Sequence, residues 1–243
     1  MGTTETRGAS DLPLRDQLRS ARKLSAGLRR LGWPEAEIDQ FLDEARSVRF
    51  ERGRVLYRDG SSATDLYWML EGVAKLSVPG ALGKRVLVAL AKPGALLGMH
   101  LVAGGKRLDE ASALTPLHAA EISSTRFREI TAGLPVAVLQ EMTRVTLDYL
   151  SRTFARTVKL LTLDLRGKLA LGLLDVADGF GVIDADGRLL KIRLTHEEIA
   201  DLTGVSRARV TKALREFADQ GLVVRRGRDL VIRARELREV CGG

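Results

Sequence analysis

The chain has 243 residues, of which 45% are hydrophobic and 29% charged, a balance typical of a globular protein. Its net charge of +8 at pH 7 favours polyanionic partners, but charge alone does not single out nucleic acid. The lone cysteine, Cys241, excludes an intrachain disulfide framework and an iron–sulfur cluster held by one chain. No apolar run approaches the ~20 residues of a transmembrane helix, and we find no secretory signal, so we expect a cytoplasmic protein without a membrane partner.

Residues 1–45 predict a polar lead-in followed by two helices. Residues 1–11 are polar and rich in small side chains, which favours disorder. The stretch Arg15–Leu31 predicts a basic helix. Pro34 at a first helical position predicts a second, short helix that runs to Leu42. We therefore expect an N-terminal extension over residues 1–45.

Residues 46–134 predict an all-β domain. Short apolar runs alternate with glycine-containing turns, which favours an antiparallel barrel or sandwich over βαβ units. The predicted strands are Val48–Phe50, Val55–Tyr57, Leu66–Leu70, Val73–Val78, Val86–Leu90, Ala111–Leu114 and Leu117–Ile122. Ser123 and Ser124 then predict the cap of a short helix.

Residues 135–165 predict one long amphipathic helix. Apolar side chains recur every three or four positions, at Leu147, Leu150, Phe154, Val158 and Leu161. This stripe has two interpretations, a helix packed on its own domain or the seam of a homodimer. We favour the homodimer.

Residues 166–243 predict a winged helix-turn-helix. Thr195 and Ser206 are N-caps of two helices, and Gly204 permits the left-handed turn between them. We expect the two helices to share an apolar core of Ile199, Leu202, Val205, Val210, Leu214 and Phe217. Strands at 189–194 and 222–225 bracket the pair, and a turn at 226–229 leads to a third strand at 230–232. The fold class is therefore α+β.

The outer face of the second of these helices predicts contact with double-stranded DNA. Arg207, Arg209 and Lys212 lie where such a helix meets base edges in the major groove. We expect nearby hydroxyl and imidazole groups to contact phosphates, at Thr195, His196, Ser206 and Thr211. The alternatives are a solvated basic face on an ordinary helical bundle and a non-specific architectural DNA protein.

Leu194–Leu214 resembles the DNA-binding signature of the cyclic AMP receptor protein and fumarate–nitrate regulator superfamily of bacterial transcription factors. Asp65–Leu76 and Pro93–Gly98 resemble segments of the β-roll effector domain of that superfamily. The resemblance implies a dimerisation helix, a homodimer on a pseudo-palindromic site, and contact with RNA polymerase. By position, Arg207 then reads a base and Thr195 and Ser206 hold phosphate. Ala208 replaces a glutamate that accepts a hydrogen bond from cytosine, so we expect a different half-site.

The expected effector pocket departs from its nucleotide-binding relatives. Gly98 is followed by Met99 and His100, where those relatives carry a glutamate for the ribose hydroxyls. Arg107 aligns with their phosphate-binding arginine, but Leu108 stands in place of serine. Unpaired ribose and phosphate groups are costly to bury, so we expect a degenerate pocket without cyclic nucleotide.

The sequence predicts no other cofactor and no enzymatic activity. The three histidines, His100, His118 and His196, are not paired at metal-ligand spacing, so we expect no metal site. Haem ligated by His100 is an alternative reading of the altered loop. No nucleophile and base share a motif, and we assign no catalytic residue.

Overall fold

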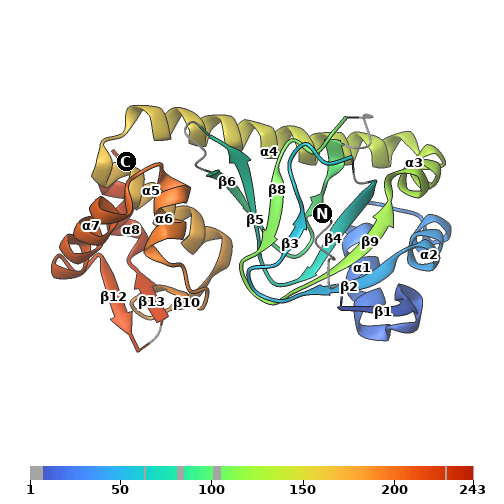
Figure 1. Ribbon diagram of the computed structural model, residues 1–243, viewed down its shortest axis with the longest axis horizontal. Helices are drawn as coiled ribbons and strands as arrows, with labels where there is room; N and C mark the ends of the chain where they lie inside the picture. The colour runs from blue at the N-terminus through green and yellow to red at the C-terminus, as the bar shows by residue number, and fades with distance from the viewer. Residues whose placement is uncertain (1–7, 63, 81–84, 101–104, 228, 243) are drawn as a thin grey trace, which may run out of the picture. The chain divides into compact units, whose positions relative to one another are not determined.

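The computed structural model describes residues 8–62, 64–80, 85–100, 105–227 and 229–242. The chain divides into two compact units (Figure 1). The first comprises Met1–Pro79 and Leu90–Tyr149, and the second comprises Gly80–Ala89 and Leu150–Gly243. Helix α4, Val136–Thr162, supplies residues to both.

Two antiparallel sheets form the roll in the first part of the chain, as predicted. One has the strand order β1-β2-β9-β4-β7 and the other β3-β8-β5-β6. The strands are β1 Gly8–Pro13, β2 Arg46–Phe50, β3 Val55–Tyr57, β4 Asp65–Glu71, β5 Ala74–Pro79, β6 Arg85–Ala91, β7 Leu96–Leu97, β8 Glu110–Ala113 and β9 Leu117–Ser123. The sequence predicted all of them except β1 and the two-residue β7. Helix α3, Ser124–Ala132, follows β9, with Ser123 as its N-cap.

Side chains of a strand point alternately to opposite sides, and in β4 both sides are buried, each in a different core. Tyr67 and Met69 lie in the core of the roll with residues of β2, β8 and β9. Leu66, Trp68 and Leu70 lie in a second core formed with the N-terminal helices. The continuous apolar run of the sequence reflects this double burial.

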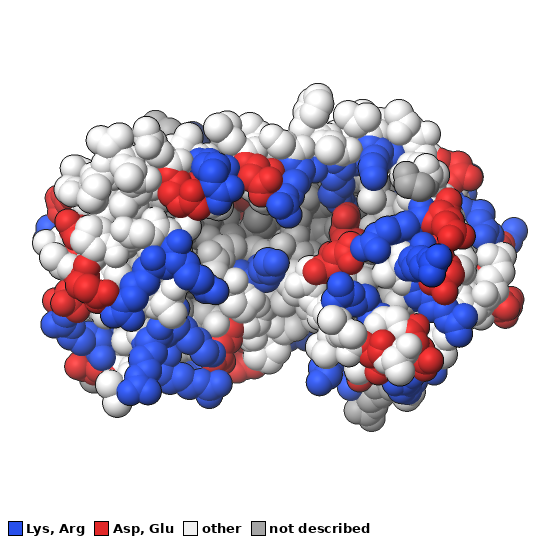
Figure 2. Space-filling view, turned by 180° about the vertical axis from the view of Figure 1, so that it is seen from behind, with Lys and Arg blue, Asp and Glu red and all other residues white. Residues whose placement is uncertain are grey.

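The N-terminal helices are α1, Leu18–Arg30, and α2, Glu35–Glu44. Gly27 allows α1 to approach the sheet, since a Cβ there would lie 2.9 Å from the Trp68 ring. Basic side chains gather over the part of the first unit that holds α1 and β2 (Figure 2). The positive charge of the protein is therefore not confined to the helix-turn-helix.

The prediction of a disordered lead-in over residues 1–11 is wrong where the structure describes it. Residues 1–7 lie outside the described residues, but β1 pairs antiparallel with β2. An edge strand can form through backbone hydrogen bonds alone, so its polar side chains gave no strand pattern. Helix α1 begins at Leu18 rather than Arg15, because Leu14–Asp16 forms a 3₁₀ turn.

His118 on β9 is buried beside α1. Its Nε2 shares a hydrogen bond with Ser47 Oγ on β2 at 2.6 Å. Burial lowers the pKa of His118, and neighbouring cations (Arg49, Lys23 and Arg19) lower it further, whereas Glu71 opposes them. Folding therefore favours the neutral over the protonated imidazole.

The part of the second unit that follows α4 is a winged helix-turn-helix. Its elements after α4 are α5 Leu165–Phe180, β10 Gly181–Asp184, β11 Gly187–Leu190, α6 His196–Thr203, α7 Arg207–Asp219, β12 Val223–Arg226, β13 Asp229–Ile232 and α8 Ala234–Val240. The sheet order is β10-β11-β13-β12, all antiparallel. The sequence did not predict β10 or α8, and it extended β11 to residue 194, whereas that strand ends at Leu190.

The predicted helix over 135–165 ends at Thr162, and α5 is a separate helix. Asp164 is the N-cap of α5, since its Oδ1 accepts a hydrogen bond from the Gly167 backbone N–H at 2.7 Å. None of the helices in the described residues combines the length and apolar character that crossing a bilayer requires.

Candidate nucleic-acid interface

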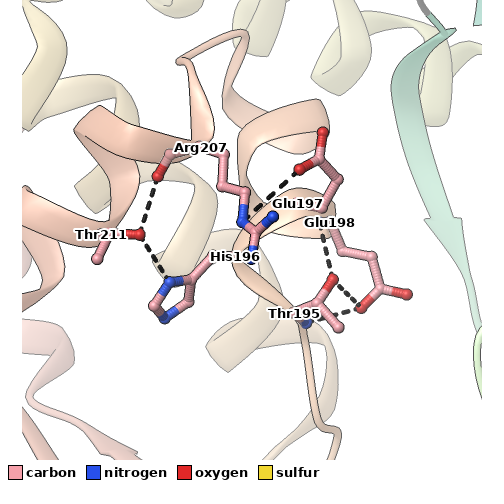
Figure 3. Close-up of polar contacts among 6 residues, drawn as sticks. All are labelled: Thr195, His196, Glu197, Glu198, Arg207 and Thr211. Carbon is pink, nitrogen blue, oxygen red and sulfur yellow. Dashed lines mark hydrogen bonds and ion pairs between the residues drawn. The ribbon is translucent and has the colours of Figure 1, made fainter.

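Helix α6 begins with a complete capping box at Thr195 (Figure 3). The Thr195 hydroxyl accepts from the Glu198 backbone N–H at 3.1 Å, and the Glu198 carboxylate accepts from the Thr195 N–H at 2.8 Å. This reciprocal pair satisfies backbone groups that a helix start leaves unpaired. At the other end, Gly204 adopts φ +69°, the left-handed conformation that glycine enters without strain. The turn between α6 and α7 is thus fixed by its local sequence.

The two helices share an apolar core. Ile199, Leu202, Val205, Val210 and Phe217 are all buried, as predicted. Leu214 was also assigned to this core, but it is only half-buried, and Ala213 is buried instead. The core residues of α7 therefore leave its opposite side to solvent.

That opposite side carries the predicted base-reading residues. At about 100° per residue, Ala208, Lys212 and Arg215 lie directly opposite the buried side of α7, and all three are exposed. Arg207 and Arg209 flank this face on either side and are also exposed. Arg215 was not predicted, although its spacing of three from Lys212 could have placed it on the same face.

Arg207 is nearly unrestrained. Its Nε lies 3.9 Å from Glu197 Oε2, and both side chains are mostly exposed (Figure 3). Such an exposed pair contributes only about 0–1 kcal/mol, so the guanidinium can leave the carboxylate at little cost. Ser206 precedes it as the N-cap, but its hydroxyl makes no capping hydrogen bond.

His196 and Thr211, both predicted phosphate contacts, lie together. Thr211 Oγ1 donates its one proton to the Arg207 carbonyl at 3.0 Å and lies 2.8 Å from His196 Nδ1 (Figure 3). The Thr211 hydroxyl thus shares a hydrogen bond with the His196 imidazole. This contact joins the first turn of α6 to the second turn of α7.

The wing carries further arginines. Arg226 on β12 pairs with Asp184 at 2.9 Å and with Asp186 at 2.6 Å, which ties the wing to the β10–β11 turn. Arg225 is exposed. Arg228, in the predicted wing turn, lies outside the described residues.

In the roll, Arg107 is the central residue of the expected effector pocket. It is only 1% exposed, and its guanidinium lies 3.9 Å from the Tyr57 ring centroid. One nitrogen donates to the Asp65 carbonyl, whereas Nε and Nη1 are buried without a partner in the described residues. Gly98 has φ +85°, and a Cβ there would clash with the Arg107 guanidinium.

The other predicted pocket residues lie at its margin. Met99 is 38% exposed and Leu108 is 71% exposed. Neither side chain carries an oxygen or nitrogen that could pair with the buried guanidinium. His100 Nε2 accepts a hydrogen bond from the Leu108 backbone N–H at 3.1 Å. Burial lowers the pKa of His100. Among the residues that the structure describes, no cluster of three or more His, Cys, Asp or Glu side chains could hold a metal ion.

Two family models match the chain. The cyclic nucleotide-binding domain matches residues 47–133, and the Crp-like helix-turn-helix domain matches residues 167–239. The first match covers the roll that contains Arg107, and the second covers α6, α7 and the wing.

Characterised relatives cover most of the chain. The chain is 28% identical over 202 residues to a CRP-like cAMP-activated global transcriptional regulator of Mycobacterium tuberculosis, covering 83% of this chain and 90% of the relative. It is 28% identical over 182 residues to the global nitrogen regulator of Synechococcus elongatus, covering 72% and 80%.

Solved structures agree in fold. A CRP-family transcriptional regulator from Thermus thermophilus superposes with a TM-score of 0.67 at 25% identity, covering 80% of this chain and 96% of that one. FixK2 from Bradyrhizobium japonicum superposes with a TM-score of 0.70 at 20% identity, covering 81% and 96%. The chain belongs to the CRP/FNR superfamily of transcription regulators, with a cyclic nucleotide-binding domain and a DNA-binding helix-turn-helix.

Proposed function

We propose that the protein is a homodimeric transcription regulator that binds a pseudo-palindromic promoter site through the major groove. The observation that carries this proposal is the exposed basic side of α7, opposite a fully apolar core. Arg207, Arg209 and Lys212 read base edges, and Arg215 joins them on the same surface. Thr195, His196, Ser206 and Thr211 hold the phosphates on either side.

The homodimer forms along α4. Leu147, Leu150, Phe154, Val158 and Leu161 are between 44% and 76% exposed in the single chain. Large apolar side chains in one continuous stripe are unfavourable in water, and a second copy of the helix would cover them. This exposure favours the dimer seam over a helix packed on its own domain. Two copies related by a two-fold axis would place two α7 helices on the two half-sites.

Footprinting on genomic promoter fragments tests the site. We expect a protected two-fold sequence. The Arg207→Ala variant of the protein should lose about 1–3 kcal/mol of specific binding to that sequence, with little loss on random DNA. Equal loss on both would make Arg207 a phosphate contact. A specificity ratio near one for the wild-type protein would instead indicate a non-specific architectural protein.

The effector domain acts without cyclic AMP. Its residues do not fit the nucleotide: Met99 offers no acceptor to the ribose hydroxyls, and the Arg107 guanidinium is already stacked on Tyr57 and bonded to Asp65. Haem fits poorly as well, because His100 Nε2 already accepts a hydrogen bond. Calorimetry with cyclic AMP, cyclic GMP and cyclic di-GMP tests the first point, and a visible absorption spectrum tests the second. Micromolar binding of cyclic AMP would refute the argument from Met99.

RNA polymerase is the proposed protein partner, and the cytoplasm the proposed location. In vitro transcription from the footprinted promoter, with and without the protein, measures the effect on polymerase. We also retain 1–45, 46–134, 135–165 and 166–243 as the proposed domain limits, which limited proteolysis would test.

A further inference from the structure

A groove of about 560 Å³ opens beside α7 in the second unit. It lies between α7, the wing strands β12 and β13, and the segment that leads into α6. Its floor is apolar and half-buried, and includes Ile192, Leu194, Leu214 and Leu230. The volume falls within the roughly 300–1,000 Å³ of small-molecule sites. The partial exposure of Leu214, which the sequence assigned to the core, results from this groove.

The rim of the groove is strongly basic. Arg193, Arg215 and Arg225 line it and are exposed, and no Asp or Glu is present among its described lining residues. The side chains of Arg215 and Arg225 have no hydrogen-bond or ion-pair partner in the part of the chain that the structure describes. Three guanidinium groups around an apolar floor complement a ligand that is anionic at one end and hydrocarbon at the other.

We propose that this groove binds an amphipathic monocarboxylate, with its hydrocarbon part on the floor and its carboxylate on Arg215 and Arg225. A DNA phosphate could satisfy the arginines, but it would leave the apolar floor without a partner. A hydrocarbon chain buries that floor, and each methylene removed from water strengthens binding about fourfold. The apolar floor is therefore what favours this ligand class over the nucleic-acid backbone.

The regulatory consequence rests on the proposed function. His196 and Thr211, two proposed phosphate contacts, also line the groove, and Arg215 lies on the face opposite the core of α7. A carboxylate at Arg215 would neutralise part of the positive surface that DNA needs. The ligand and DNA should therefore compete, which makes the groove a site for switching DNA binding off.

The first test measures ligand binding by the full chain without DNA, using decanoate in isothermal titration calorimetry below its micelle concentration. We expect one site per chain. Acetate and 1-decanol should each bind at least tenfold more weakly, because acetate lacks the hydrocarbon chain and 1-decanol lacks the carboxylate. Arg215→Gln should weaken decanoate at least fivefold. Arg209→Gln, which removes the same charge from the far side of α7, should change it less than twofold. Equal effects of these two variants, or no binding of decanoate, would overturn the proposal.

Ala218→Leu is a second variant that keeps all charges. Ala218 is exposed on α7 and lines the groove, so a leucine there should fill part of the floor and weaken decanoate at least fivefold. Its melting temperature shows whether the chain still folds. Decanoate should then lower the affinity of the wild-type protein for its footprinted DNA at least tenfold, and that of Ala218→Leu less than twofold. Decanoate binding that leaves DNA affinity unchanged would overturn the competition, whereas absence of any DNA site would count only against the proposed function.

Discussion

Arg156 joins three helices of the second unit, so its removal should loosen the helix-turn-helix. Its guanidinium donates to Asp175 on α5 at 2.5 Å and to the Leu202 carbonyl on α6 at 2.9 Å. The Arg156 side chain is 19% exposed and the Asp175 side chain 35%. Removing one partner of a buried pair costs about 3–5 kcal/mol, and water at the exposed third of Asp175 recovers part of this. We expect Arg156→Ala to cost about 2 kcal/mol of local stability.

Hydrogen–deuterium exchange of α6 amides measures this cost. A loss of about 2 kcal/mol corresponds to roughly thirtyfold faster exchange through local opening. Arg152→Ala, an exposed arginine on the same helix, is the matched control and should leave α6 unchanged. The double variant Arg156→Met with Asp175→Leu should recover much of the loss, because it leaves no buried charge unpaired. Exchange in Arg156→Ala within twofold of wild type would refute this reasoning.

Three further predictions follow from packing and charge. Phe154→Glu places a charge on the proposed dimer seam and should halve the mass measured by light scattering, whereas Arg152→Glu, on the other side of α4, should not. Burial lowers the pKa of His118 in the folded chain, so the free energy of unfolding should have its full value above the ordinary histidine pKa of about 6.5 and should decrease as the pH falls below it. The urea midpoints at pH 7.5 and 5.5 should therefore differ less in His118→Gln than in the wild-type protein. Gly98→Ala should cost more than about 1 kcal/mol in thermal unfolding, because of its positive φ and its contact with Arg107; an unchanged melting temperature would contradict that geometry.

The parts of the fold that depend on local sequence were predictable. Gly204, the capping residue Thr195 and the periodic core of α7 are each encoded within a few positions, and together they located the helix-turn-helix. The glycine-separated strands of the roll were found for the same reason. By contrast, β1 forms through backbone pairing with β2, which leaves no pattern in its side chains.

The candidate site was predictable in its outline but not in its environment. The basic residues of α7 follow from helical spacing, and even the missed Arg215 obeys it. The groove beside α7 could not be predicted from helical spacing, because its walls come from segments as distant in the sequence as Ile192 and Leu230. Likewise, the stacking of Arg107 on Tyr57 joins residues that only the folded roll brings together.

The pairing of β1 with β2 has a practical consequence for protein engineering. A shortened protein that began at Leu14 would turn β2 into the edge of its sheet and leave its outward backbone groups unpaired. Unprotected edges recruit strands from other molecules, which leads to aggregation. Arg46 and Arg49 would be the only charged side chains on that new edge strand. Expression trials of the roll should therefore retain residues 8–13, however dispensable their sequence looks.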